Sequence, residues 1–421
     1  MFKLLSRGTA KLYTASDSKS EYKTMIRTLN GENKTSTLEA QVVNDTLLKQ
    51  ACWTLAHAKE IHVIHDPSDI RKPHSKKTEN LGKVRDLKGN IINGYSTHNA
   101  VAIVPTEKAV HLLSHRAYSN KDAKFLKKEC IAKLEKNKAF DGDDAAKKLY
   151  ESGDYFNKKT IGLHEIEAIG KELKNANPDA LITHVLDREF DDTEYFELID
   201  AKLSQHYIAR GKKSRILDVK DPQGKSIKLM DTKFDNYGEK KFQKLHIAGQ
   251  CIQDGKIVIS WQRYNDYNAV KTKVYDRTGK SVFEDGMLLL TNKVINSFED
   301  ADQIYLTYLK RAKIEYVFKF LKEGLGWEDI QIQDFKAIQK VLSLCFYVAS
   351  YLYEIGEEKT YDDYAILLAE MGGGKGKVTR HFITQGIQDL INHYRIGRFL
   401  KAKEVSQAQQ DAMCTAFGGA L

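Results

Sequence analysis

Two short apolar runs in the first half of the chain each end in an aspartate. Residues 60–66 (Glu-Ile-His-Val-Ile-His-Asp) and 181–187 (Leu-Ile-Thr-His-Val-Leu-Asp) have the composition of mostly buried strands. Pro67 follows the first run directly and is expected to stop that strand after Asp66. Asp66 and Asp187 are therefore predicted at the carboxyl ends of two strands.

Both aspartates also have a purely structural explanation. An Asp-Pro pair commonly opens a turn, and Asp69 lies three residues beyond Asp66 as a competing candidate. After Asp187, either Asp191 or Asp192 is expected to cap the helix that follows, so Asp187 could simply belong to the turn. The turn explanation does not account for the same placement occurring twice.

Residues 308–322 have the pattern of an amphipathic helix with an unusual polar stripe. At about 100° per residue, four polar side chains fall within roughly 60° of one another, opposite an apolar face. They are Tyr308, Arg311, Glu315 and Lys322. In one interpretation, Glu315 simply pairs with Arg311 one turn before it and with Lys319 one turn after it. In the other, Glu315 holds a metal ion and the remaining three contact phosphate, because phosphodiester cleavage requires both on one surface.

The rest of the pattern divides the chain into five regions. Helical spacing at the start gives way to alternating strands and helices, then to strands separated by turn signals, and finally to helices again. The predicted regions are 1–58 (helical, a candidate for DNA binding), 59–210 (strands and helices), 211–290 (a β-rich insertion), 291–330 (the polar-striped helix) and 331–421 (helical, a candidate for dimerisation).

Charge and composition narrow the choice of partners. The formal net charge of +9 points towards a polyanionic partner. Seven cations between Arg71 and Lys88 are typical of a solvated loop, but they also suit a segment that follows a phosphate backbone. The longest apolar run, residues 341–353, is too short to span a bilayer, and no signal peptide is expected. The five cysteines form no CxxC motif, which predicts reduced thiols in a cytoplasmic protein.

Taken together, these elements resemble a known family. The predicted order of strands and helices, with acids on the first strand, the fourth strand and the last helix, resembles the ribonuclease-H-like core of DDE transposases. The spacing Tyr308-x2-Arg311-x3-Glu315-x6-Lys322 is similar to the Tyr-Arg-Glu-Lys signature of bacterial cut-and-paste insertion-sequence transposases at all four positions. Three further segments resemble the family's two aspartate segments and its strand that ends in a DNA-contacting arginine. They are residues 64–68, 185–189 and 207–210.

The resemblance implies a fold class, a reaction and roles for individual residues. The fold would be α/β, with a ribonuclease-H-like core in 59–210 and 291–330 and the β-rich insertion before the last acidic helix. Two Mg²⁺ ions, for which Mn²⁺ would substitute, would activate the attacking water or 3′-hydroxyl and stabilise the leaving oxygen. The catalytic metal ligands would be Asp66, Asp187 and Glu315, and the DNA-binding residues would be Tyr308, Arg311, Lys322 and Arg210.

The same resemblance implies a biological setting. A homodimer in the bacterial cytoplasm, associated with the nucleoid when bound, would pair two inverted-repeat transposon ends, cut them and join them to target double-stranded DNA. Two alternatives stay open. One is a domesticated protein that binds DNA through the same fold without cutting it, and the other is a simple metal-dependent nuclease.

Overall fold

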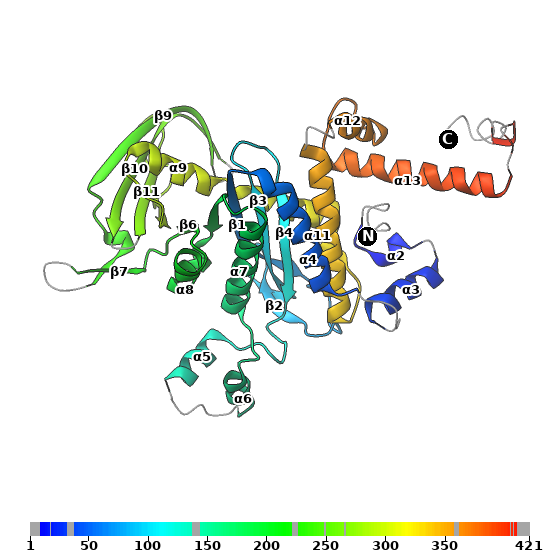
Figure 1. Ribbon diagram of the computed structural model, residues 1–421, viewed down its shortest axis with the longest axis horizontal. Helices are drawn as coiled ribbons and strands as arrows, with labels where there is room; N and C mark the ends of the chain where they lie inside the picture. Colours follow the sequence, from blue (N-terminus) through cyan, green and yellow to red (C-terminus); the bar gives the residue numbers. More distant parts are fainter. Residues whose placement is uncertain are drawn as a thin grey trace.

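The computed structural model shows a mixed α/β fold built around one large sheet (Figure 1). It describes residues 9–16, 18–31, 38–136, 144–220, 226–247, 250–264, 267–357, 362–404, 406 and 408–410. Within these residues, ten strands form a mixed sheet in the order β2-β3-β1-β5-β6-β12-β11-β10-β9, with β4 also paired to β3.

The strands follow the alternation of apolar and polar positions. Those of the large sheet are β1 (Glu60–Arg71), β2 (Gly82–Arg85), β3 (Ile91–Ile103), β4 (His111–Tyr118), β5 (Leu181–Leu186), β6 (His206–Arg210), β9 (Asn236–Ile247), β10 (Gln250–Tyr264), β11 (Tyr267–Tyr275) and β12 (Met287–Thr291). The short strands β7 (Ile216–Lys220) and β8 (Ser226–Lys228) pair only with each other.

Helices cover the sheet and extend from both sides of it. They are α2 (Leu12–Ala15), α3 (Lys19–Leu29), α4 (Ala40–Thr54), α5 (Lys128–Glu135), α6 (Asp144–Ser152), α7 (Lys158–Ala176), α8 (Thr193–Glu197), α9 (Phe298–Leu309), α10 (Ala312–Lys319), α11 (Phe335–Glu357), α12 (Asp362–Met371) and α13 (Arg380–Ala402). In the described part of the chain, no helix has the length and apolar character needed to cross a membrane.

β1 lies at the centre of the part of the sheet that carries the candidate acids. It runs antiparallel to β3 and parallel to β5, and β5 runs parallel to β6. His65 of β1 pairs with Leu186, the last residue of β5. Asp66 and Asp187 directly follow these two residues on parallel neighbours, so both aspartates lie at the same edge of the parallel pair.

The prediction that Pro67 ends the first strand is wrong, because β1 continues to Arg71. Its ladder with β3 runs on to Arg71 opposite Gly94, whereas its pairing with β5 stops at His65. Backbone N–H groups alternate between the two sides of a strand, and the Arg71 N–H points away from β3, towards Glu328. Pro67 lies four residues before Arg71, so its backbone nitrogen also points away from β3. Beyond His65, β1 has no neighbouring strand on that side, so the N–H that proline lacks would have had no strand to bond to.

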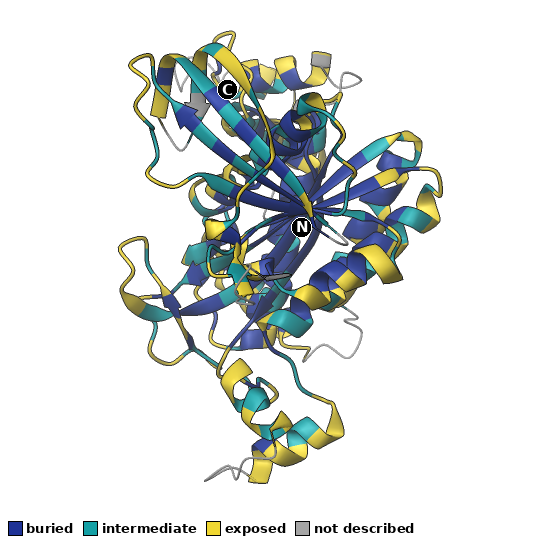
Figure 2. Ribbon diagram, turned by 90° about the vertical axis from the view of Figure 1, so that its left-hand side faces the viewer, coloured by how far each residue is buried: buried dark blue, intermediate teal, exposed yellow. Residues whose placement is uncertain are grey.

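Alternate residues of β1 face different helices. Ile61 and Val63 pack in a cluster with Leu48 of α4 and Ile169 of α7. Ile64 faces the other side and belongs to the cluster that contains Ile314 of α10. Burial therefore concentrates along the strands, and the outer faces of the helices are exposed (Figure 2). Since Asp66 shares the parity of Ile64, its side chain points towards the α9–α10 side.

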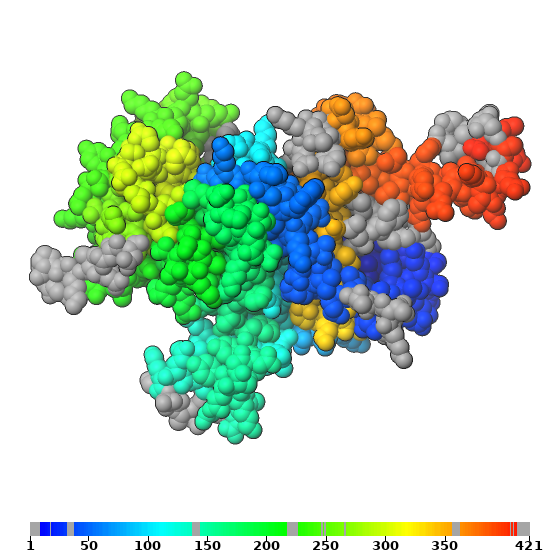
Figure 3. All heavy atoms as spheres, in the orientation of Figure 1, coloured from blue at the N-terminus to red at the C-terminus, as the bar shows by residue number. Residues whose placement is uncertain are grey.

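Three extensions surround this centre. The region predicted to be β-rich contains β7 to β12, and β12 joins the sheet by pairing with β6. The α5–α6 pair projects below α7, and α13 extends away from the opposite side of the molecule (Figures 1 and 3).

Candidate active site

Asp66 is a buried carboxylate that contacts a buried cation. Its side chain is 11% exposed, and its Oδ2 lies 3.0 Å from Nη1 of Arg311. Burial raises the pKa of Asp66 to about 7, although the Arg311 charge opposes this shift, and the negative charges of Asp187, Glu189 and Glu315 raise the pKa further. The three acids predicted from the sequence thus lie close enough for their charges to interact.

Asp187 follows β5 and contacts the first residue of the Tyr-Arg-Glu-Lys set. The hydroxyl of Tyr308 donates a hydrogen bond to Oδ1 of Asp187 over 3.3 Å. Tyr308 is 3% exposed, and burial raises the pKa of its hydroxyl, with the Asp187 charge acting in the same direction. Tyr308 is therefore a neutral donor that orients the Asp187 carboxylate.

The predicted continuous helix through Tyr308 and Glu315 is broken. α9 runs from Phe298, after its capping residue Ser297, to Leu309, and α10 begins at Ala312. Arg311 lies between the two helices and serves as the amino-terminal cap residue of α10. From this position the Arg311 guanidinium contacts both Asp66 and Glu315.

Glu315 makes one of the two ion pairs that the structural interpretation anticipates, the pair with Arg311, whereas Lys319 pairs with Glu323. Its Oε1 accepts a hydrogen bond from Nη2 of Arg311 over 2.8 Å. The Glu315 side chain is 59% exposed, in contrast to the 17% exposure of Arg311. Glu315 therefore approaches the other acids from the solvent side, with Arg311 between it and Asp66.

Lys322 lies apart from the three acids, beside Glu328. Its Nζ is 3.8 Å from Oε1 of Glu328, and burial lowers the pKa of Lys322. Glu328 is held mainly by Arg71, which donates from Nε over 2.9 Å and from Nη2 over 3.0 Å. Sequence reasoning missed Glu328, because no motif links it to Arg71, which lies far away in the chain.

The first two cations of the 71–88 run are structural. Arg71 holds Glu328, and Nζ of Lys72 donates to the backbone oxygens of Glu328 and Ile330 over 2.6 and 2.7 Å. Lys72 is 6% exposed, and burial lowers its pKa to about 8. Neither residue lies in a solvated loop.

The competing acids have other roles. Asp69 accepts a hydrogen bond from the hydroxyl of Ser96 over 3.1 Å and lies on the opposite face of β1 from Asp66. Asp192 caps α8, as expected for one of the two candidates, and Asp191 accepts hydrogen bonds from Lys212 and Arg215. These contacts leave Asp66 and Asp187, with Glu189 beside them, as the acids of the groove at this edge.

A shallow groove with three cations and three carboxylates in its lining opens beside the two aspartates. It is lined by Asp66, Pro67, Asp187, Arg188, Glu189, Arg210 and Lys212. Arg210, the predicted DNA-contacting residue, lies at the end of β6 within this groove. Arg188 and Lys212 were missed in the sequence, although each lies within two residues of a predicted site residue.

The three carboxylates are suitable ligands for a hard divalent cation, but the Arg311 guanidinium lies between those of Asp66 and Glu315. Carboxylate oxygens are the ligands that Mg²⁺ and Mn²⁺ prefer. Across the described ranges, no three His, Cys, Asp or Glu side chains are grouped closely enough to hold a metal. Asp66 and Glu315 are instead bridged by the Arg311 guanidinium. The residues fit a metal if Arg311 turns towards an anionic substrate.

Comparisons with known proteins do not assign a family, because no protein-family model and no curated protein matches the chain.

Proposed function

We propose that the protein is a metal-dependent DNA transposase of the ribonuclease-H-like type. It would bind the inverted-repeat ends of a transposon in the bacterial cytoplasm, cleave a DNA strand there and transfer that strand to target DNA. The observation that carries this proposal is that Arg311 pairs with both Asp66 and Glu315, while Asp66 and Asp187 line one open groove together with Arg188, Arg210 and Lys212.

The strand order supports the same proposal. β4, β3 and β1 are successive antiparallel neighbours, and β5 and β6 continue the sheet parallel to β1. This is the arrangement that the resemblance implies for a ribonuclease-H-like core. The remaining acid, Glu315, comes from a helix that packs near β1 after the intervening strands β7 to β12.

Some of the chain's own residues would bind the substrate, and others would orient or neutralise the carboxylates. Arg210, Arg188 and Lys212 line the groove and would hold the DNA backbone through its phosphates. Tyr308 would keep the Asp187 carboxylate oriented through its hydroxyl. Arg311 balances the charge of Asp66 and Glu315 without substrate and would turn to the scissile phosphate when DNA binds.

Asp66, Asp187 and Glu315 would hold the divalent ions. When bound, these ions supply a deprotonated oxygen nucleophile and stabilise charge on the leaving oxygen. All three positions are carboxylates, so each contributes the negative charge that such ions require.

One feature favours a second function, a protein that binds DNA without cutting it. The bridge of Arg311 between Asp66 and Glu315 is complete, and such a bridge would persist in a protein that never binds metal. The two functions differ in one assay, which uses paired duplexes that carry the inverted repeats flanking the gene, with Mg²⁺ or Mn²⁺. A transposase cuts and joins them, a simple nuclease cuts without joining, and a non-cutting protein only binds.

The three cations of the groove lead to a prediction about salt dependence. Arg210→Ala should weaken binding to DNA of any sequence and make the negative slope of log affinity against log salt shallower by about one, because one phosphate contact is lost. Lys319→Ala is the matched control, since its exposed side chain lies on α10 away from the groove. Affinity measured by fluorescence anisotropy at several salt concentrations gives both slopes. Equal slopes for the two variants would remove Arg210 from the DNA interface.

Lys322→Ala belongs to the same series. Its ammonium lies beside Glu328 and outside the residues that line the groove, so its effect on the slope should be smaller than that of Arg210→Ala. A loss as large as that of Arg210→Ala would show that DNA extends from the groove to Lys322.

A homodimer on paired DNA ends is part of the proposal, and α13 is the surface we expect to form it. The helix exposes several large apolar side chains, namely Leu390, Tyr394, Ile396 and Phe399. Tyr394→Glu should halve the mass of the complex with two-ended DNA, measured by light scattering, because a buried carboxylate opposes association. Tyr13→Glu, at another exposed tyrosine, should leave the mass unchanged. A Tyr394→Glu complex of full mass would place the dimer contact elsewhere.

A further inference from the structure

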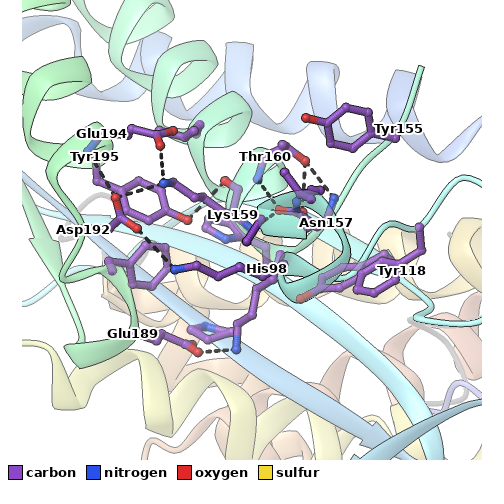
Figure 4. Close-up of a pocket in the computed structure, with 18 of the residues that line it drawn as sticks. His98, Tyr118, Tyr155, Asn157, Lys159, Thr160, Glu189, Asp192, Glu194 and Tyr195 are labelled. Carbon is purple, nitrogen blue, oxygen red and sulfur yellow. Dashed lines mark hydrogen bonds and ion pairs between the residues drawn. The ribbon is translucent and has the colours of Figure 1, made fainter. Parts of the chain in front are cut away.

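A cavity of about 510 Å³ lies on the α7 side of the sheet, next to the candidate active site. It is enclosed by α5, the start of α7 and the turn between β5 and α8. Its walls are rich in aromatic rings, namely Tyr118, Phe125, Tyr155, Phe190 and Tyr195. Figure 4 shows His98 between Tyr195 and Tyr118. The volume falls in the range of roughly 300 to 1,000 Å³ that is usual for small-molecule sites.

His98 is the end of a buried row of three histidines. Nε2 of His98 lies 3.3 Å from Nδ1 of His65, and Nε2 of His65 lies 3.0 Å from Nδ1 of His184. Nε2 of His184 lies 2.7 Å from Oε1 of Gln205, whose Nε2 donates to the backbone oxygen of Gly170 over 2.9 Å. Burial lowers the pKa of His98 and of His184 to about 4, so these rings are neutral at pH 7.

The row can carry its protons in only one arrangement. The Gly170 oxygen fixes the amide of Gln205, so Oε1 faces His184, and Nε2 of His184 must be the donor. A neutral ring has one N–H, so Nδ1 of His184 accepts from His65, and Nδ1 of His65 accepts from His98. The Nδ1 atom of His98 is thereby left as an acceptor, without a partner among the described residues, on a ring that is 3% exposed and lines the cavity.

The cavity is aromatic and close to charge balance, so it does not suit a free phosphate. The amines at its rim are already paired with carboxylates, as in the ion pairs of Lys158 with Glu189 and of Lys159 with Asp192. Lys128 also lies 3.8 Å from Asp192. What the cavity offers an occupant is ring faces and one buried acceptor, which together favour a neutral planar molecule with an N–H donor.

The cavity adjoins the groove that holds the candidate acids. Pro67, Glu189 and Lys212 line both spaces. Pro67 directly follows Asp66 and pairs with His98 across β1 and β3. A group attached to DNA in the groove can therefore enter the cavity without crossing the sheet.

We propose that this cavity binds one unpaired nucleobase of the DNA strand that lies in the groove. The base would stack on the aromatic walls and donate an N–H to Nδ1 of His98. This inference rests on the proposed function, because it takes the ligand in the groove to be DNA. It assigns a role to α5 and to the start of α7, which contribute nothing to the acids.

The first test uses a short single-stranded oligonucleotide with one central 2-aminopurine, whose fluorescence changes when the base stacks. Ala132→Trp fills the cavity from α5 and should weaken binding of this probe about tenfold and abolish the fluorescence change. Tyr155→Ala removes a wall and should weaken binding in the same direction. Ala145→Trp, the same change at an exposed position of α6 outside the cavity, should behave as the unmodified protein. Unmodified-like binding and fluorescence of both cavity variants would overturn the proposal.

The second test addresses the acceptor. The unmodified protein should prefer an oligonucleotide with adenine at the central position to one with unsubstituted purine by about tenfold, since unsubstituted purine lacks the amino donor. His98→Phe should bind both probes equally. Two results would remove His98 from the base site. One is that the unmodified protein shows no preference for adenine, and the other is that His98→Phe keeps this preference.

The strand-cleavage assay separates this inference from the proposed function. A protein that responds to the probes as expected but cuts no DNA would contradict the transposase and leave a nucleobase site. A protein that cuts and joins DNA, but whose cavity variants bind the probes normally, would contradict the base site alone.

Discussion

Asp187→Asn should abolish DNA strand cleavage by orders of magnitude in Mg²⁺ while binding to transposon ends is retained. The amide keeps the shape of the side chain and can still accept the Tyr308 hydrogen bond, but it lacks the charge that a divalent ion needs. Binding survives because the phosphate contacts come from the cations of the groove. Cleavage of a labelled paired-end substrate on a denaturing gel measures the first effect, and anisotropy measures the second.

Asp179→Asn is the matched control for this change. Asp179 is an exposed aspartate before β5 that does not line the groove, so its variant should cut at the normal rate. Normal cleavage by Asp187→Asn would end the transposase proposal. The same holds if the unmodified protein fails to cut paired ends with either Mg²⁺ or Mn²⁺.

Trp327→Ala should lower the free energy of unfolding by about 3–5 kcal/mol, the range for removing a large buried aromatic side chain. Trp327 is fully buried and packs against the rings of His115 and Phe318, at centroid distances of 5.4 and 6.4 Å. The change leaves a cavity directly before Glu328, which anchors Arg71 and lies beside Lys322. Urea unfolding followed by circular dichroism measures the loss.

Trp53 offers the comparison for this stability prediction. Its side chain is 81% exposed on α4, so Trp53→Ala should change the free energy of unfolding by only about 0.5 kcal/mol or less. If both variants lose a similar amount of unfolding free energy, the packing around Trp327 does not determine how much this residue contributes to stability.

The sequence predicted the strands that carry the acids better than it predicted their ends. The apolar runs before Asp66 and Asp187 indicate strands because β-branched composition is a local property. The continuation of β1 past Pro67 depends on its antiparallel partner β3, which follows β2 in the chain, and on the end of β5 at Leu186. The residues around Pro67 reveal neither the pairing with β3 nor the position at which β5 ends.

The site was predictable as a set of residues but not as an arrangement. Helical spacing places Tyr308, Arg311 and Glu315 on one face, but it reveals neither the break between α9 and α10 nor the contact of Arg311 with Asp66. The ion pair between Arg311 and the buried Asp66 of β1 joins residues far apart in the chain, so hydrophobic periodicity cannot predict it. Glu328 and His98 were missed because their partners come from distant parts of the chain.

The pairing of β12 with β6 has a mechanical consequence for the β-rich region. Leu289 lies opposite Arg210, and Leu290 lies opposite Ala209, so the backbone that carries a groove residue is bonded to the strands beyond it. Bending at this junction would have to break these ladder hydrogen bonds, which restrain the β-rich region relative to β6. A displacement of the outer strands would therefore be transmitted to Arg210 through backbone hydrogen bonds between strands and not through side-chain contacts.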